Sequence, residues 1–338
     1  MKKVLIIYGG KSSEHDISIK SAKFIIDNID KEKYDVSQAF IDKEGQWRWR
    51  YGEKKDEIIE NIVSYLKQFN VVFPVLHGLY GEDGTIQGML ELLGIPYVGC
   101  KVLTSSICMD KIYSKVIFDT CNIKNAKSVY IKYISKDKYL YHDKQFNCKI
   151  IDSVELISII EANLKYPLFV KPSRSGSSIG VTKVQNNTEL TFAIENAAKY
   201  DNKILIEQSI IGKEVEVAVL GDSINGIEVS DIGEILSAED FYSFSSKYEN
   251  TNSKTRVPAD ISREQSDLIK KYAKQLFTAI DGNGLSRIDF FVENSTGNIY
   301  INEINTMPGF TNISMYPILM KYFGYNNSNL IDRLINLA

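Results

Sequence analysis

The stretch RIDFFVENSTGNIYINEIN, residues 287–305, constrains the fold more than any other part of the sequence. Two apolar runs flank the short loop 295–297, which contains a glycine, and this pattern is typical of a β-hairpin. Because side chains alternate across a strand, residues 287, 289 and 291 should share one face, and residues 301, 303 and 305 should share one face of the return strand. The hairpin therefore aims a row of polar groups in one direction.

With the turn centred on Thr296, Asp289 lies opposite Glu303 and Arg287 lies opposite Asn305. Directly opposed carboxylates destabilise a sheet, since paired residues are only about 4.5–5.5 Å apart at Cβ, so we expect a positive group between them. Two carboxylates and an amide oxygen on one face of a rigid hairpin suit a hard cation such as Mg²⁺. The alternative is a solvated face on which Arg287 neutralises the two acids.

The composition narrows the class of protein. A chain of 338 residues exceeds one typical core and suggests two or three domains. The formal charge of -3 gives no reason to expect a nucleic-acid partner. The four cysteines form no CxxC pair and the three histidines are scattered, so neither zinc nor a disulfide framework is indicated. The first residues, MKKVLIIYGG, lack a cleavage site, and no apolar run is long enough to cross a bilayer, which predicts a cytoplasmic protein.

The order of apolar segments predicts an α/β protein of three parts. Strands at 3–8, 70–76 and 95–99, with helices from near Ser18 and over 86–94, indicate an open parallel sheet that ends near residue 100. A helix over 105–122 and several short strands follow, and the remainder holds strands, a helix at 262–280, the hairpin and a terminal helix. We therefore expect domains at 1–99, 100–211 and 212–338.

Two loops at strand ends carry candidate ligand groups. The first glycine turn places Glu14 at the carboxyl end of a strand, where it either pairs with a substrate ammonium or caps a helix. In HGLYGEDGTIQG, residues 77–88, His77 is either a ligand contact or an orienting hydrogen-bond partner. Glu82 and Asp83 in that loop are expected to be helix caps.

The loop KPSRSGSSIG, residues 171–180, has the small residues that let backbone N–H groups approach an anion. Lys171, Ser177 and Ser178 would add a charge and two hydroxyls, which suits nucleotide phosphates; a plain surface turn is the alternative. The later stretch FYSFSSKY, residues 241–248, is long and aromatic, so it predicts a lid in which Lys247 and Tyr248 close over phosphate and substrate. Disorder is the alternative there.

Five motifs together resemble one family. HGLYGEDGTIQG, VKPSRSGSSIGV, SSKY, SRIDFF and NEINTMPGFTNISMYP occur in the order and spacing of the D-alanine:D-alanine ligases, which belong to the ATP-grasp superfamily. The resemblance runs from Gly9 to the C-terminus and extends to the D-alanine:D-serine and D-alanine:D-lactate ligases of glycopeptide resistance. It implies an ATP-grasp fold preceded by an open parallel-sheet domain, and a cytoplasmic homodimer that makes D-alanyl-D-alanine for peptidoglycan from ATP and D-alanine.

The resemblance also implies a role for each site residue. Two Mg²⁺ ions, or Mn²⁺, would be bound by Asp289, Glu303 and Asn305. The phosphates would contact Lys111, Lys171, Ser178 and Lys247, and the adenosine would be held by Glu207 and Glu214. The first D-alanine would contact Glu14 and His77, with Ser177 and Tyr248 completing a network around Glu14. The second D-alanine would be bound by Ser314 beside Met315, and the oxyanion by Arg287 and the N–H of Gly309.

Two departures and two alternatives remain open. Ser243 and Phe244 replace an Asp and a Tyr of the usual lid sequence, whereas Met315 stands where resistance ligases commonly carry arginine. The first alternative is the same fold making D-alanyl-D-serine or, less in keeping with the motifs, D-alanyl-D-lactate. The second is a noncatalytic nucleotide-binding regulator, which would have no use for a metal pair and an oxyanion donor.

Overall fold

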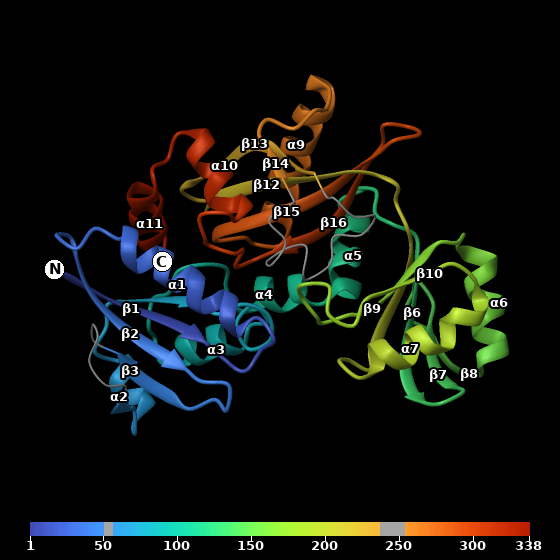
Figure 1. Cartoon of the computed structure of the whole chain (residues 1–338), viewed down its shortest axis with the longest axis horizontal. Coiled ribbons are helices and arrows are strands. Elements are labelled where there is room, and N and C mark those ends of the chain that lie inside the picture. Colours follow the sequence, from blue (N-terminus) through green and yellow to red (C-terminus); the bar gives the residue numbers. More distant parts are fainter. Residues whose placement is uncertain (51–56, 237–253) are drawn as a thin grey trace.

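The computed structural model describes residues 1–50, 57–236 and 254–338, and Figure 1 shows three β-sheets with their helices. The predicted lid at 241–248, with Lys247 and Tyr248, lies outside the described residues, as do Ser243 and Phe244. Within the described ranges no helix is both long and apolar enough to cross a bilayer.

The first sheet has the strand order β4-β3-β2-β1-β5. Its strands are β1 (Lys2–Gly9), β2 (Tyr34–Ile41), β3 (Trp47–Arg50), β4 (Glu57–Ile58) and β5 (Val71–Val75). The central strand β1 runs parallel to β2 and β5, as the sequence predicts, but β3 and β4 add an antiparallel edge. Helix α1 (His15–Asn28) packs on one face and α3 (Thr85–Leu92) on the other, and the short α2 (Ile62–Leu66) precedes β5.

One expectation for this sheet is wrong, and the expected start of a helix near Ser18 is three residues late. Residues 95–99 form only a single parallel bridge, between Tyr97 and Val72, because Pro96 has no N–H to donate and Gly99 turns the chain with φ +103°. Helix α1 begins at His15, and Ser18 lies inside it, fully buried, where its hydroxyl accepts a hydrogen bond from the Gly9 N–H at 2.8 Å.

The second sheet is antiparallel, with the order β10-β9-β11-β6-β7-β8. Its strands are β6 (Ser128–Ser135), β7 (Lys138–His142), β8 (Cys148–Ile151), β9 (Leu168–Pro172), β10 (Thr182–Val184) and β11 (Lys203–Gln208). Helices α6 (Ser153–Asn163) and α7 (Leu190–Ala198) share a core with it, and the 3-10 turn η1 (Asn187–Glu189) leads into α7.

The third sheet has the order β14-β13-β12-β15-β16 and is also antiparallel. Its strands are β12 (Gly212–Asp222), β13 (Gly226–Leu236), β14 (Lys254–Arg256), β15 (Gly284–Glu293) and β16 (Ile299–Asn305). Helix α9 (Arg263–Ala279) covers one face and α10 (Met315–Phe323) the other, followed by α11 (Asn327–Asn336). Helices α10 and α11 also share a core with α1 and β1, so the first and third sheets are joined across a hydrophobic interface.

The hairpin β15–β16 has the predicted pairing where it matters for a site. Asp289 lies opposite Glu303, and Arg287 opposite Asn305. A β-bulge after Asp289 shifts the register nearer the turn, so the expectation that residues 301, 303 and 305 share one face is wrong. Ile301 instead packs in the core with the other apolar residues of β16.

The single helix expected over 105–122 is two helices, α4 (Val102–Met109) and α5 (Lys111–Thr120). Asp110 separates them, because its carboxylate accepts the N–H groups of Ile112 and Tyr113 and so caps α5. Both helices pack into the core of the third sheet, although the sequence assigns them to the middle domain. The domain boundaries near residues 99 and 211 remain predictions.

Candidate active site

Two adjoining hollows lie where the three sheets meet. The small cavity, of about 120 Å³, is lined by loops of the first sheet and by the segment after β16. The large cleft, of about 600 Å³, lies between the second and third sheets. They share the lining residues Lys111, Ser175, Gly176, Ser177, Ile235 and Glu303.

The structure brings the described candidate residues together around these hollows. The small cavity is lined by Glu14, His77, Lys111, Ser177, Arg287, Glu303, Asn305, Gly309, Ser314 and Met315. The large cleft is lined by Lys111, Lys171, Ser177, Ser178, Glu207, Glu214 and Glu303. Asp289 lines neither hollow, because it is buried behind Arg287.

Glu14 sits at the N-terminus of α1, yet its side chain makes no capping hydrogen bond. Its buried carboxylate instead accepts a hydrogen bond from the hydroxyl of Ser177, a residue 163 positions away. Two glycines make room for this contact, because a Cβ at Gly78 or Gly176 would lie 2.4 or 2.8 Å from the Glu14 Oε2. The capping alternative for Glu14 is therefore wrong as far as its side chain is concerned.

The serine-rich loop reaches Glu14 through an unusual backbone. Ser177 and Ser178 both adopt the left-handed conformation, with φ of 49° and 60°. Non-glycine residues rarely occupy this region, and such strain clusters at functional sites. Beside them, the Nζ of Lys111 donates to the Ser175 carbonyl at 2.9 Å and lies 3.3 Å from the Glu303 carboxylate.

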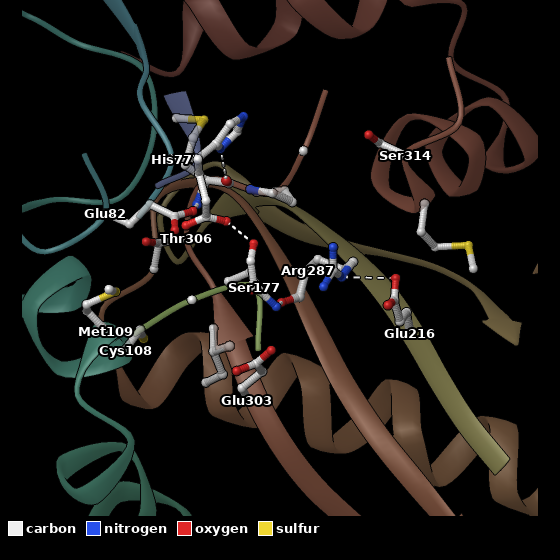
Figure 2. Close-up of a pocket in the computed structure, with 18 of the residues that line it drawn as sticks. His77, Glu82, Cys108, Met109, Ser177, Glu216, Arg287, Glu303, Thr306 and Ser314 are labelled. Atoms are coloured by element: carbon white, nitrogen blue, oxygen red, sulfur yellow. Dashed lines mark hydrogen bonds and ion pairs between the residues drawn. The ribbon is translucent and has the colours of Figure 1, made fainter. Parts of the chain in front are cut away.

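Arg287 lies between two acids of neighbouring strands. Its Nε and Nη2 donate to the two carboxylate oxygens of Asp289 at 2.8 and 2.7 Å. Nε also lies 3.0 Å from the carboxylate of Glu216, the β12 residue paired with Asp289 (Figure 2). Glu216 was not predicted from the sequence, although an acid within the apolar run VEVAV is a signal that such a partner exists.

The predicted positive charge between the opposed acids of the hairpin is thus supplied by protein side chains. Arg287 binds Asp289, and Lys111 lies beside Glu303. The amide of Asn305 donates to Asp289 at 3.0 Å, so the three oxygen-bearing groups cluster at one end of the hairpin. No group of three or more His, Cys, Asp or Glu side chains suited to a metal occurs in the described ranges. Glu303 and Asn305 line the small cavity with a carboxylate and an amide oxygen, which suit Mg²⁺ with water and phosphate as its other ligands. Asp289 would join them by exchanging a contact with Arg287 for the metal.

A buried charge cluster contributes Lys171 and Glu207 to the lining of the large cleft. Glu207 forms ion pairs with Lys171 and, at 3.2 Å, with Lys115. Burial alone would raise the pKa of Glu207, but the two ammonium groups outweigh it and lower that pKa to about 2. Burial lowers the pKa of Lys115, a residue that no sequence motif indicated.

His77 is an orienting residue in the described structure. Its Nδ1 bonds to the Met307 carbonyl at 3.0 Å, and its Nε2 bonds to the Ser21 hydroxyl at 2.9 Å. Burial lowers the pKa of the imidazole to about 4, so it is neutral at pH 7.

The two acids of the same loop behave differently from each other. Asp83 accepts the N–H of Thr85, the first residue of α3, although the N-cap position itself is Gly84, which has no side chain to cap with. Glu82 is not a cap: it accepts the N–H groups of Gly78 and Met307 inside the small cavity. No local sequence pattern indicates this contact, since Met307 is 225 residues away.

Ser314 precedes α10 and aims its hydroxyl at the turn before the helix, where it bonds to the Thr311 N–H at 3.0 Å. A helix N-terminus of this kind favours a bound carboxylate. Met315 is buried, and its sulfur packs so closely over Gly233 that a Cβ there would lie 2.6 Å away. A Cβ at Gly309 would lie 3.0 Å from the Ser314 Oγ, so the cavity has little room to spare there.

Comparison with known families shows which family the chain belongs to. Residues 140–336 match the family described as D-ala D-ala ligase C-terminus, and residues 3–100 match D-ala D-ala ligase N-terminus. The chain belongs to the D-alanine–D-alanine ligase family. It therefore has the ATP-grasp fold, and the family consists of ATP-dependent ligases that use a divalent metal.

Relatives match the ligase along its whole length. The D-alanine–D-alanine ligases of Acetivibrio thermocellus and Clostridium acetobutylicum are each 44% identical to it, over all of this chain and 96% or 98% of theirs. A crystal structure of VanG D-Ala:D-Ser ligase from Enterococcus faecalis superposes with a TM-score of 0.85 and 37% identity, over 99% of both chains. The D-alanine-D-alanine ligase from Coxiella burnetii gives 0.81 and 30%, over 99% of this chain and 93% of that one.

Proposed function

We propose that this ligase joins two D-alanine molecules, through a D-alanyl phosphate, to give D-alanyl-D-alanine for peptidoglycan synthesis. The observation that carries the proposal is the junction of the two hollows at Lys111, Ser177 and Glu303. A nucleotide in the large cleft and an amino acid in the small cavity would meet there, which brings a γ-phosphate next to a substrate carboxylate. Whole-length similarity to proteins named D-alanine–D-alanine ligase supports the choice of substrate.

The large cleft is assigned to ATP. Its volume of about 600 Å³ falls within the range typical of small-molecule sites. We infer that Lys111, Lys171 and Ser178 contact the phosphates, while Glu207 and Glu214 hold the adenosine part. Lys247 is assigned to the phosphates from the sequence motif alone.

Asp289, Glu303 and Asn305 are assigned to two Mg²⁺ ions, with Mn²⁺ as a substitute. Bound metal would neutralise the charge that develops on the phosphates. The chain contributes by placing Asp289 opposite Glu303 on a rigid hairpin, and by holding Asp289 with Arg287. Lys111 beside Glu303 adds positive charge at the same edge of the cleft.

The first D-alanine is assigned to Glu14, whose carboxylate would pair with the substrate ammonium while Ser177 orients it. The substrate carboxylate then attacks the γ-phosphorus, the bond to the bridging oxygen breaks, and ADP leaves with that electron pair. Tyr248 is assigned to the same network from the motif alone. His77 contributes by holding the cavity wall at Met307.

The second D-alanine is assigned to Ser314 at the N-terminus of α10, next to Met315. Its unprotonated amine attacks the carbonyl carbon of the acyl phosphate, and the nitrogen loses a proton as the carbon–oxygen bond to phosphate breaks. Arg287 and the N–H of Gly309 are assigned to the oxyanion formed on the way, because both face the small cavity.

Product identification tests the proposal. The enzyme is incubated with ATP, Mg²⁺ and equal D-alanine, D-serine and D-lactate at pH 7.5, and the products are identified by mass spectrometry. We expect mainly D-alanyl-D-alanine, since Met315 adds no positive charge beside the second site and an amine is the better nucleophile at this pH. An apolar pocket rejects an added hydroxyl only by about a hundredfold.

D-serine is the main alternative to D-alanine as second substrate, because the similar VanG structure is that of a D-Ala:D-Ser ligase. Mainly D-alanyl-D-serine would overturn the choice of second substrate, and ADP release independent of D-amino acids would overturn the ligase assignment.

We further propose that the enzyme is a homodimer in the cytoplasm. Light scattering after gel filtration and cell fractionation test these two points.

A further inference from the structure

The segment that follows β16 is held by three side chains of the first sheet's loops and helix. Glu82 accepts the Met307 N–H at 3.2 Å, and the Nδ1 of His77 bonds to the Met307 carbonyl at 3.0 Å. Ser21 of α1 accepts the Phe310 N–H at 3.1 Å. Figure 2 shows His77 and Glu82 next to this segment, with a dashed line from His77 to the carbonyl.

The hydrogens in this network can be assigned without ambiguity. The Met307 carbonyl can only accept, so the Nδ1 of His77 carries the hydrogen. The Nε2 of a neutral imidazole is then an acceptor and takes the hydroxyl hydrogen of Ser21 at 2.9 Å. The Ser21 oxygen is left to accept from Phe310. Each donor has one acceptor, so the segment is held in a single arrangement.

Glu82 holds the same segment from inside the cavity. One carboxylate oxygen binds Met307 and the other binds the Gly78 N–H at 3.1 Å, so the side chain links two loops that are distant in sequence. Burial raises the pKa of Glu82 well above its usual value, and the negative charge of the nearby Glu14 raises it further. The two backbone N–H groups oppose that rise.

The held segment contains Gly309, whose N–H is assigned to the oxyanion, and leads to Ser314 at the second substrate site. A Cβ at Gly309 would lie 3.0 Å from the Ser314 Oγ, so a larger residue at this position would press on Ser314. A donor displaced by a fraction of an ångström loses much of its effect on a developing charge, because such stabilisation depends on prior orientation. Holding Met307 and Phe310 therefore holds the donor between them.

We propose that Glu82, His77 and Ser21 form a clasp on Met307–Phe310, and that Glu82 and Ser21 are positioning residues for the amide-forming step. The inference rests on the proposed function. It assigns to the N-terminal part of the chain a second task, beyond supplying Glu14: it sets the geometry of backbone atoms contributed by the C-terminal part.

Two variants test the clasp from its two ends. Ser21→Ala removes the acceptor for Phe310, and Glu82→Gln keeps the shape but replaces one acceptor oxygen with an amide nitrogen. Asp83→Asn is the control, because Asp83 lies in the same loop and bonds to the N–H groups of Tyr80 and Thr85 in that loop. Each protein is assayed for kcat, for KM of ATP, for dipeptide formed per ADP released, and for its melting temperature.

We expect Ser21→Ala and Glu82→Gln to lower kcat by about two- to tenfold, as for one lost hydrogen bond, with an unchanged KM for ATP. Dipeptide per ADP should fall below the wild-type ratio, because acyl phosphate that is not captured by the amine hydrolyses. Asp83→Asn should keep the wild-type ratio. Should Ser21→Ala fail to fold, Glu82→Gln alone decides the outcome.

Two results would overturn the clasp: a wild-type kcat and ratio in both variants, or a lower melting temperature accompanied by no change in the ratio. A wild-type enzyme that forms no dipeptide would instead overturn the proposed function. The two failures are therefore distinguishable.

Discussion

The buried cluster of Glu207 with Lys171 and Lys115 predicts a specific dependence of stability on pH. The pKa of Glu207 is lowered from 4.5 to about 2 in the folded protein. A lowered pKa means that folding favours the ionised carboxylate, so the stabilisation is fully present above the unfolded value of 4.5. It is lost as the pH falls from there toward 2.

The magnitude follows from the shift. A difference of 2.5 units between 4.5 and 2 corresponds to about 3 kcal/mol of folding free energy at neutral pH. Glutamine resembles the protonated acid, so Glu207→Gln should lower the free energy of unfolding by about 3 kcal/mol at pH 7. By about pH 3.5 the linkage relation predicts that about 1 kcal/mol of this difference has disappeared.

Urea unfolding of both proteins, followed by far-UV circular dichroism at pH 7 and at about pH 3.5, measures the two differences. Amide hydrogen exchange in β11 reports the same quantity for the strand that carries Glu207. Glu155→Gln is the control, because Glu155 forms an ion pair with Lys149 at the surface, and exposed pairs contribute less than about 1 kcal/mol. A Glu207→Gln protein as stable as the wild type at pH 7, or a stability difference that does not narrow in acid, would show that the ionised Glu207 does not stabilise the fold.

Three further predictions concern catalysis and the central loops. Glu303→Gln should abolish Mg²⁺-dependent ADP release while the circular dichroism spectrum stays unchanged; near-normal turnover would remove Glu303 from the metal site. Ser177→Ala should lower kcat/KM for D-alanine by about two- to tenfold, because it removes the hydroxyl that orients Glu14, and unchanged kinetics would show that this contact is dispensable. Asp110→Ala removes the cap of α5 together with the contacts to Ser173 and Lys203, so the free energy of unfolding in urea titrations should fall by more than the about 0.5–2 kcal/mol of a lost cap alone; full stability would contradict both roles.

Local rules were enough to predict the hairpin and its polar row. The alternation of side chains and the length of the loop place Asp289 opposite Glu303, and the structure has this pairing. The parallel pairing of β1 with β5 and the helix at 262–280 likewise follow from apolar periodicity. Each of these features depends on residues close together in sequence, so the pattern of a short segment contains the information.

The bulge after Asp289 could not be predicted from these local rules. Its position depends on the packing of Ile301 into the core, which the sequence of the hairpin alone does not reveal. The break at Asp110 was missed for a similar reason. Besides capping α5, its carboxylate accepts the hydroxyl of Ser173 at 2.7 Å and pairs with Lys203, and neither residue is near it in the chain.

The same distinction between local and long-range information applies to the site. Motifs identified Glu14, Ser177 and Arg287 as residues of one site, but their sequence neighbourhoods say nothing about which of them touch. The contact of Glu14 with Ser177 spans 163 residues, and that of Glu82 with Met307 spans 225. Periodicity and turn chemistry act over a few residues. The contact of Glu82 with Met307 depends on the hydrophobic burial that brings the first and third sheets together. The contact of Glu14 with Ser177 instead joins the first sheet's helix α1 to the loop between β9 and β10 of the second sheet. The types of residue in the site could therefore be predicted from the sequence alone. Their mutual geometry is determined by the packing of distant parts of the chain.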